Sequence, residues 1–185
     1  MQDAGITKGG DGFFQGAEGR LRWEVKTNAS ADNEVETSIL ASTWRQIGFD
    51  FQQATLPASQ AQDGQARATF PTLYNFGTSV GENTLAAMNT PGIPKPENRW
   101  TGNNRGGWSN ATFDRVSEEL TRSVEPTERA RQVAQLAAIF SQEVAAIPLY
   151  FYGLPIVASS AVRGPTQVVQ ETPFEWNIHE WELTR

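Results

Sequence analysis

The chain has 185 residues, 38% of them hydrophobic, and a formal net charge of −6. A nucleic-acid surface needs clustered Lys and Arg to neutralise phosphates, whereas lysine occurs here only at positions 8, 26 and 95, so we expect no nucleic-acid partner. Cysteine is absent, which excludes disulfides, thiolate catalysis and cysteine-based metal sites, and no apolar run reaches the ~20 residues that span a bilayer.

Residues 19–56 predict a strand, a helix and a second strand. In the first strand, apolar residues alternate with charged ones, as expected when one face is buried: Leu21, Trp23 and Val25 against Arg22, Glu24 and Lys26. The helix is expected over residues 30–48, with Asn33 and Glu36 as a capping box, Gly48 at its end, and an apolar stripe of Val35, Ile39, Leu40 and Ile47. Alternation resumes at Phe49 and Phe51. A unit of this kind places its two strands parallel in one sheet.

The middle of the chain is predicted to be poorer in regular structure. Residues 58–68 are polar and allow one or two helical turns, and residues 69–80 predict a third strand whose start Pro71 confines to a sheet edge or a loop. Residues 81–110 are rich in Gly and Pro and read as a long loop. Loops of this length in compact domains usually carry function, and Trp100 and Trp108 favour an ordered, packed loop.

Two helices and two short strands are expected in the C-terminal part. The first helix covers about residues 112–123, with apolar spacing at Phe113, Val116 and Leu120, and the second opens at Pro126. The stripe of the second helix is Val133, Leu136, Ala137, Phe140 and Val144. Residues 145–160 predict two apolar strands around Gly153. The fold class is therefore α/β, with a mixed β-sheet flanked by helices.

Few residues suit catalysis. His179 is the sole histidine, so histidine metal clusters are excluded by count, and no Gly-x-Ser-x-Gly elbow is present. Carboxylate pairs such as Glu180 and Glu182 could serve acid–base chemistry, but most acidic side chains fall on presumed exposed helix faces. The glycine-rich residues 8–14 follow no strand and lack the phosphate-loop pattern. We therefore expect no enzyme, no cofactor and no metal.

A binding face is the stronger prediction. Tyr74, Asn75 and Phe76 end the third predicted strand, and the long loop adds Trp100, Asn104 and Trp108. Ligands of open α/β sheets lie outside the carboxyl ends of the strands, in pockets with apolar walls and a few placed polar groups. For Trp108, packing that pins the loop is favoured over a direct ligand contact.

Three motifs in order resemble the family 5 extracellular solute-binding proteins, the peptide, nickel and opine binders of ABC transporters. They are the Gly-Trp-Ser-Asn-x-x-Phe-Asp motif at residues 107–114, an acidic residue plus proline at Glu125 and Pro126, and the Ile-Pro-Leu-Tyr motif at residues 147–150. The strand–helix–strand at residues 21–51 resembles the start of that family's second lobe. The resemblance covers nearly the whole chain.

The resemblance implies the second lobe of a two-lobed periplasmic-binding-protein-like fold. Residues 1–160 would form this lobe, and residues 161–185 would return toward a missing first lobe. The implied protein is a monomeric, non-enzymatic solute-binding component of an oligopeptide-type ABC importer, with a small solute and the transporter permease as partners. The implied location is periplasmic or extracellular, with a lipid tether as one form.

The sequence departs from the family at one point that concerns the ligand. Where peptide binders often carry Trp-Gly-x-Asp, this chain has Phe76, Gly77, Thr78 and Ser79. Ser79 supplies no negative charge to pair with a peptide's amino terminus. Glu82 would take the place of the missing aspartate only if the loop turned back. Ser79 remains a candidate hydrogen-bonding residue, and a neutral, modified or sugar-like solute stays open beside a peptide. The alternative functions are a small carboxylate-dependent hydrolase and a protein-interaction domain.

Overall fold

The computed structural model describes residues 1–79, 81–153, 155–164 and 175–184. The chain divides into two compact units, one made of Met1–Gly77 and Ala87–Arg115, the other of Thr78–Ala86 and Val116–Arg185. Among the described residues, every helix is too short or too polar to cross a membrane.

The first unit is built on a parallel sheet of three strands, β4 (Arg22–Asn28), β5 (Asp50–Leu56) and β6 (Leu73–Asn75), in the order β5–β4–β6. Both neighbours of β4 run parallel to it, which confirms the predicted strand–helix–strand unit. Strand β6 lies at an edge and begins after Pro71, as expected for a residue that cannot donate to a ladder. A small antiparallel sheet precedes it, of β1 (Thr7–Lys8), β2 (Phe14–Gly16) and β3 (Gly19–Arg20).

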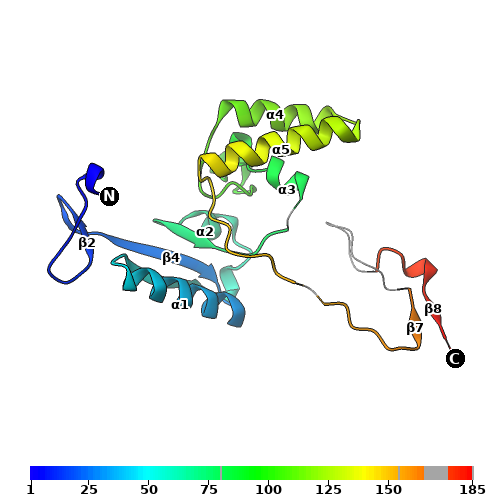
Figure 1. The fold of residues 1–185 in the computed structure, drawn as a ribbon, viewed down its shortest axis with the longest axis horizontal. Helices are drawn as coiled ribbons and strands as arrows, with labels where there is room; N and C mark the ends of the chain where they lie inside the picture. Colours follow the sequence, from blue (N-terminus) through cyan, green and yellow to red (C-terminus); the bar gives the residue numbers. More distant parts are fainter. Residues whose placement is uncertain (80, 154, 165–174, 185) are drawn as a thin grey trace. The chain divides into compact units, whose positions relative to one another are not determined.

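Helix α1 (Ala31–Gln46) lies along one face of the parallel sheet (Figure 1). Its N-cap is Ser30, whose side chain accepts a hydrogen bond from the Asn33 backbone N–H. The capping box of Asn33 with Glu36 is therefore wrong: Asn33 is already the third helical residue. The end is as expected, since Gly48 adopts a φ of +105°, a conformation that favours glycine.

The apolar stripe predicted for α1 is also wrong. Val35 and Ile39 are 61% and 60% exposed, and Ile47 is exposed as well. The residues that α1 buries are Thr37 and Ala41. The orientation follows from contacts with the sheet: the Thr37 hydroxyl accepts a hydrogen bond from Asn75 of the edge strand β6, and Trp44 packs against Phe51 of β5. The core of this unit consists of Val25, Ala41 and Phe51, with Trp23, Trp44, Phe49 and Leu73 packed against it.

A buried carboxylate begins β5. The side chain of Asp50 is 3% exposed, and it pairs with Arg20 at 2.8 Å and with Arg22 at 3.5 Å. Two guanidinium groups thus offset the cost of taking this charge out of water. The interaction ties the start of β5 to β3 and β4.

The segments on either side of β6 contain short helical pieces. Residues 58–68, predicted to allow one or two helical turns, form the 3₁₀ turn η2 (Ala58–Gln60) and α2 (Gly64–Ala68) before β6. After it come α3 (Glu82–Ala86) and the 3₁₀ turns η3 (Thr90–Gly92) and η4 (Pro96–Asn98). Apart from η3 and η4, residues 87–110 are irregular, in agreement with the prediction.

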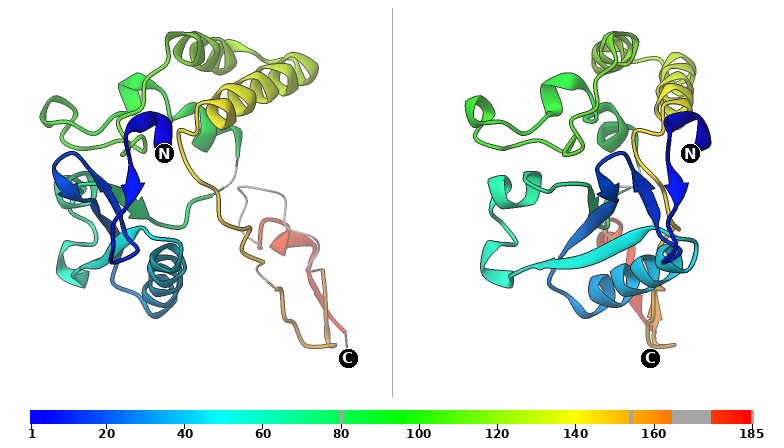
Figure 2. Two further views of the ribbon diagram at one scale, coloured as in Figure 1. Left: turned by 60° about the vertical axis from the view of Figure 1, so that its left-hand side comes forward. Right: turned by 90° about the vertical axis from the view of Figure 1, so that its left-hand side faces the viewer.

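Helices α4 (Ala111–Arg122) and α5 (Pro126–Gln142) run side by side, as Figure 2 shows. Arg129 of α5 donates hydrogen bonds to the carbonyl oxygens of Leu120, near the end of α4, and of Ser123, just beyond it. The α4 prediction is confirmed, because its three apolar residues are all buried. In α5, Leu136 is buried but Ala137 is exposed, and Val144 lies beyond the helix and is 64% exposed.

The two strands predicted around Gly153 are not formed among the described residues 145–153 and 155–160, which are irregular. Their apolar side chains are exposed, Phe151 by 83% and Val157 by 90%. High strand propensity alone does not hold a strand, because its backbone groups need a neighbouring strand to pair with. The strands near the end are β7 (Val162–Arg163) and β8 (Glu182–Leu183), which pair antiparallel, with the 3₁₀ turn η5 (Ile178–Glu180) before β8.

Candidate functional site

Strand register separates the side chains predicted at the end of β6. Tyr74 pairs with Lys26 of β4, and Asn75 pairs with Thr27. Successive side chains of a strand point to opposite faces, so Tyr74 lies on the face away from α1 and Asn75 lies on the α1 face. The contacts agree: the Asn75 side-chain amide donates to the Thr37 hydroxyl oxygen at 3.2 Å, and the Thr27 hydroxyl donates to the Asn75 carbonyl at 2.9 Å.

On the face away from α1, three aromatic rings form a row. The rings of Phe70 and Tyr74 stack with centroids 5.5 Å apart, and Tyr74 and Phe76 follow at 5.4 Å. The Tyr74 hydroxyl donates a 2.6 Å hydrogen bond to Oδ1 of Asn28, the last residue of β4. Since β4 and β6 are parallel, this bond joins the carboxyl ends of the two strands, where open α/β sheets bind their ligands.

Two arginines adjoin this row. The Arg105 guanidinium lies over the Phe76 ring, 5.0 Å from its centroid. The pKa of Arg105 is lowered, first by burial and then by the positive charge of Arg67, while Tyr74 acts in the opposite direction. The Nε of Arg67 is buried and has no hydrogen-bond partner among the described residues. We call Phe70, Tyr74, Phe76, Arg67 and Arg105 the aromatic–arginine cluster.

Asn104 holds the base of the long loop. It is 4% exposed, and its side-chain amide nitrogen donates to the carbonyl oxygens of Met88 and Asn89, each at 3.0 Å, and of Trp108 at 2.6 Å. Its backbone N–H donates to the Gly92 carbonyl at 3.1 Å. An amide nitrogen has two hydrogens, so these contacts occupy its donors.

The remaining predicted residues are Trp108, Trp100 and Ser79. The Trp108 ring packs edge-on against Phe113, which is fully buried, with centroids 4.9 Å apart, a geometry that suits pinning the loop. Trp100 is half-buried with a φ of +59°, and its backbone approaches Gly64 so closely that a Cβ at Gly64 would meet the Trp100 carbonyl at 2.7 Å. Ser79 is exposed and belongs to the other unit.

Sequence reasoning missed the two arginines and Asn28. The signal for Asn28 was available: it ends a strand whose parallel neighbour ends at Asn75, and parallel strands end at the same sheet edge. Arg67 and Arg105 are 38 positions apart, and nothing in a single sequence pairs them. Their proximity depends on the fold of the loop that carries Arg105.

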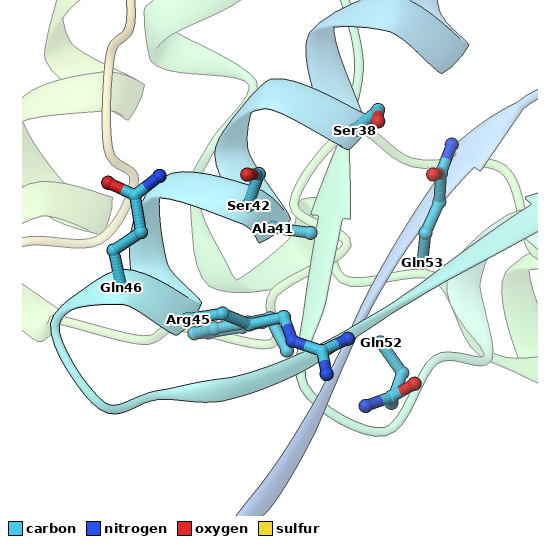
Figure 3. Close-up of a pocket in the computed structure, with 8 residues that line it drawn as sticks. Ser38, Ala41, Ser42, Arg45, Gln46, Gln52 and Gln53 are labelled. Atoms are coloured by element: carbon cyan, nitrogen blue, oxygen red, sulfur yellow. The ribbon is translucent and has the colours of Figure 1, made fainter. Parts of the chain in front are cut away.

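A separate open hollow lies between α1 and β5, with a volume of about 740 Å³ (Figure 3). Its lining is mostly polar: Ser38, Ala41, Ser42, Arg45 and Gln46 from α1, with Phe51, Gln52 and Gln53 from β5. These β5 residues belong to the amino half of the strand, whereas ligands of parallel sheets bind at the carboxyl ends. The aromatic–arginine cluster is therefore the better candidate despite the size of this hollow.

The acidic side chains of α3 and α5 are engaged in ion pairs. Glu82 of α3 accepts a hydrogen bond from the Arg129 guanidinium, so its carboxylate already has a cationic partner. The pKa of Glu128 is lowered, chiefly by the hydrogen bond from Arg131. Within the described part of the chain, no three His, Cys, Asp or Glu side chains are grouped so as to hold a metal ion.

No family model matches the chain. An uncharacterised lipoprotein of Mycobacterium tuberculosis is 31% identical over 84 residues, which make up 45% of this chain and 15% of the relative. An uncharacterised lipoprotein of Mycobacterium leprae is 30% identical over the same share. The chain thus spans about a seventh of the length of these curated relatives.

Solved structures match over much more of the chain. An oligopeptide-binding protein of Thermus thermophilus, complexed with a pentapeptide, is similar over 81% of this chain and 28% of its own, with a TM-score of 0.67 and 24% identity. NikZ of Campylobacter jejuni, in complex with Ni(L-His), matches over 98% and 37%, with a TM-score of 0.72 and 18% identity. A mannohexaose-bound periplasmic oligopeptide-binding protein of Thermotoga maritima matches over 82% and 29%, with a TM-score of 0.65 and 22% identity. The chain therefore has the α/β fold of a periplasmic-binding-protein-like lobe.

Proposed function

We propose that this chain is the solute-binding part of an oligopeptide-type ABC importer and contributes one lobe of a ligand cleft. The observation that carries the proposal is the place of the aromatic–arginine cluster, at the carboxyl ends of β4 and β6 in a lobe whose fold is shared with substrate-binding proteins. Fold alone does not specify function, so the cluster and its chemistry carry the argument.

The cluster supplies the parts that a small-molecule site requires. Tyr74 and Phe76 offer ring faces as an apolar wall, and Asn28 orients Tyr74 by accepting its hydroxyl hydrogen. Trp100 and the exposed Ser79 are further proposed contacts. Asn75, Asn104 and Trp108 support the site from behind, because their contacts are with α1 and within the loop.

In the whole protein, a first lobe would close over the solute, and hinge closure would signal occupancy to the permease. The protein acts as a monomer outside the cytoplasmic membrane, held at the cell surface by a lipid; the mycobacterial relatives that are named lipoproteins support this location. It carries out no catalysis and needs no cofactor. Affinity of this lobe alone is weak, since half of the contacts come from the other lobe.

The solute class is proposed more broadly than peptides. The similar structures hold a pentapeptide, Ni(L-His) and mannohexaose, so one fold accommodates dissimilar ligands. A peptide amino terminus would lack an acidic partner at Ser79, and the carboxylate of Glu82 is paired with Arg129. A peptide bound by other groups and an oligosaccharide are both included.

The test is an amide chemical-shift titration of the isotope-labelled chain with pooled di- to pentapeptides and with pooled oligosaccharides. We expect saturable shifts at residues 70–76 and 100–108 from one pool, and their loss in Phe76→Ala. Ile39→Ser, on the exposed side of α1, is the matched control and should bind like the parent chain. Shifts confined to α4 and α5, or turnover of a glycoside or ester substrate, would replace the proposal with an interaction domain or a hydrolase.

A further inference from the structure

The two arginines of the cluster lack the partners that arginines near a protein interior usually have. None of the ion pairs formed by the described residues involves Arg67 or Arg105. The Nε of Arg67 is buried and unpaired, and both side chains are half-buried. Elsewhere in the chain, comparable guanidiniums have carboxylates: Arg20 has Asp50, and Arg129 has Glu82.

This arrangement is costly unless something completes it. A buried polar group without a hydrogen bond destabilises the folded state, and two like charges held close repel each other. The lowered pKa of Arg105 reports the same burial and the same repulsion by Arg67. The protein is acidic overall, yet these two arginines beside the aromatic rings have no carboxylate among the described residues to neutralise them. This arrangement is typical of a site that binds an anion, not of a solvated surface.

We propose that Arg67 and Arg105 together bind an anionic oxygen group of the solute, a carboxylate or a phosphate, with the rest of the solute against Tyr74 and Phe76. The proposal rests on the proposed function and specifies its ligand class as acidic solutes. The cation–π contact with Phe76 positions the Arg105 guanidinium, whose N–H groups can then donate two parallel hydrogen bonds to the oxygen atoms of the anion. Arg67 adds the second charge.

The positive charge of the cluster distinguishes it from a site that would bind an ammonium group. Ser79 has no charge, and the carboxylate of Glu82 is engaged by Arg129, so neither residue supports binding of a cation. With two guanidiniums and no paired acid, a solute anion gains charge-assisted hydrogen bonds, which are stronger than neutral ones. The ligand's acidic end therefore lies at the carboxyl edge of β6.

Three phenyl compounds separate the contributions of ring and charge: benzoate, phenyl phosphate and the neutral benzamide. They are titrated into the whole 185-residue chain, labelled at arginine nitrogen, at constant ionic strength so that screening does not vary. We expect benzoate, phenyl phosphate or both to move the Arg67 and Arg105 side-chain N–H signals saturably, with dissociation constants about tenfold below that of benzamide. The compound that binds more tightly identifies the oxyanion.

Variants give the decisive comparison. Arg105→Gln and Arg67→Gln should each weaken binding of the tighter anion about tenfold without changing benzamide binding. Arg105→Lys should recover part of the loss because it keeps the charge. Arg122→Gln, which removes an exposed arginine paired with Glu118, is the matched control and should have no effect. Thermal unfolding of each variant reports whether the fold is retained.

The inference would be overturned if neither benzoate nor phenyl phosphate bound more tightly than benzamide. It would also be overturned if binding of the tighter anion survived in the double variant of Arg67→Gln and Arg105→Gln. Such a result would leave the solute-binding function intact if the peptide or oligosaccharide pools still shifted residues 70–76. Conversely, arginine-dependent benzoate binding with no response to any pool would establish the anion site and count against the oligopeptide-type function.

Discussion

Helices α1 and α4 differ in how their sequences relate to what they bury. In α4, the apolar residues at helical spacing, Phe113, Val116 and Leu120, are all buried. In α1, the apolar residues Val35 and Ile39 face outward, and the helix buries the hydroxyl of Thr37 instead.

The difference shows what apolar periodicity can predict. It identifies the buried face when a helix packs by its apolar stripe, as α4 does. It fails where a specific polar network sets the helix orientation: Thr37 donates to the Asn33 carbonyl at 2.7 Å and accepts from Asn75 of β6. The Thr37 hydroxyl is fully buried, so breaking its hydrogen bonds is costly and outweighs the burial of two aliphatic side chains.

The largest expected effect comes from Phe113→Ala in α4. Phe113 is fully buried and packs against Trp108, so its removal should lower the free energy of unfolding by about 3–5 kcal/mol. Ile39→Ala in α1 should change it by less than about 0.5 kcal/mol, because the side chain is 60% exposed. Urea unfolding of both variants measures this. Comparable losses would remove the distinction between the two helices.

A smaller loss is expected from Asn104→Ala, which takes away the donor shared by three loop carbonyls. The free energy of unfolding should fall by about 2 kcal/mol, since the hydrogen bonds of a buried amide to three carbonyls are lost. Amide hydrogen exchange should rise at residues 88–108 more than in α1. Asn103→Ala, at the exposed neighbouring position, is the control. If exchange in the loop did not change, Asn104 would be free to serve as a ligand contact.

Thr37→Val tests the polar network of α1 directly. The two side chains have nearly the same shape, so the expected loss of about 1–2 kcal/mol comes from the missing hydrogen bonds to Asn33 and Asn75. Ser38→Ala, on the exposed neighbouring position, should be neutral within about 0.5 kcal/mol. A stabilised Thr37→Val would mean that apolar burial, not the network, orients the helix.

The smallest effect concerns Glu128 in α5, an exposed carboxylate whose pKa is lowered by the hydrogen bond from Arg131. Because the folded-state pKa lies below the ordinary value of 4.5, its stabilisation is present above that pH and is lost as the pH falls through the lowered pKa. The melting temperatures of the parent chain and Glu128→Gln should differ slightly at pH 7 and converge at lower pH. A constant difference would assign the effect to packing.

Part of the candidate site was predictable. Residues 74–76 were expected at the carboxyl end of a strand, and the structure places them there on an edge strand. Strand alternation predicts that the side chains of residues 74–76 lie on two faces of the sheet. Only the pairing register of β6 with β4 shows that α1 covers the face with Asn75. The role of Asn104 within the loop could not be predicted, because its three acceptors are fixed by backbone geometry.

The sequence by itself determined the parallel strand–helix–strand unit, the α4–α5 pair and the acidic, cysteine-free character of the chain, because these depend on local periodicity and composition. Only tertiary structure decided which face α1 buries, that residues 145–160 form no strand where they are described, and that Arg105 lies over Phe76 within electrostatic reach of Arg67. Each of these depends on a partner distant in the chain. Strand pairs, ion pairs and hydrogen bonds each join two segments of the chain. The residue pattern within one segment therefore does not predict its partner.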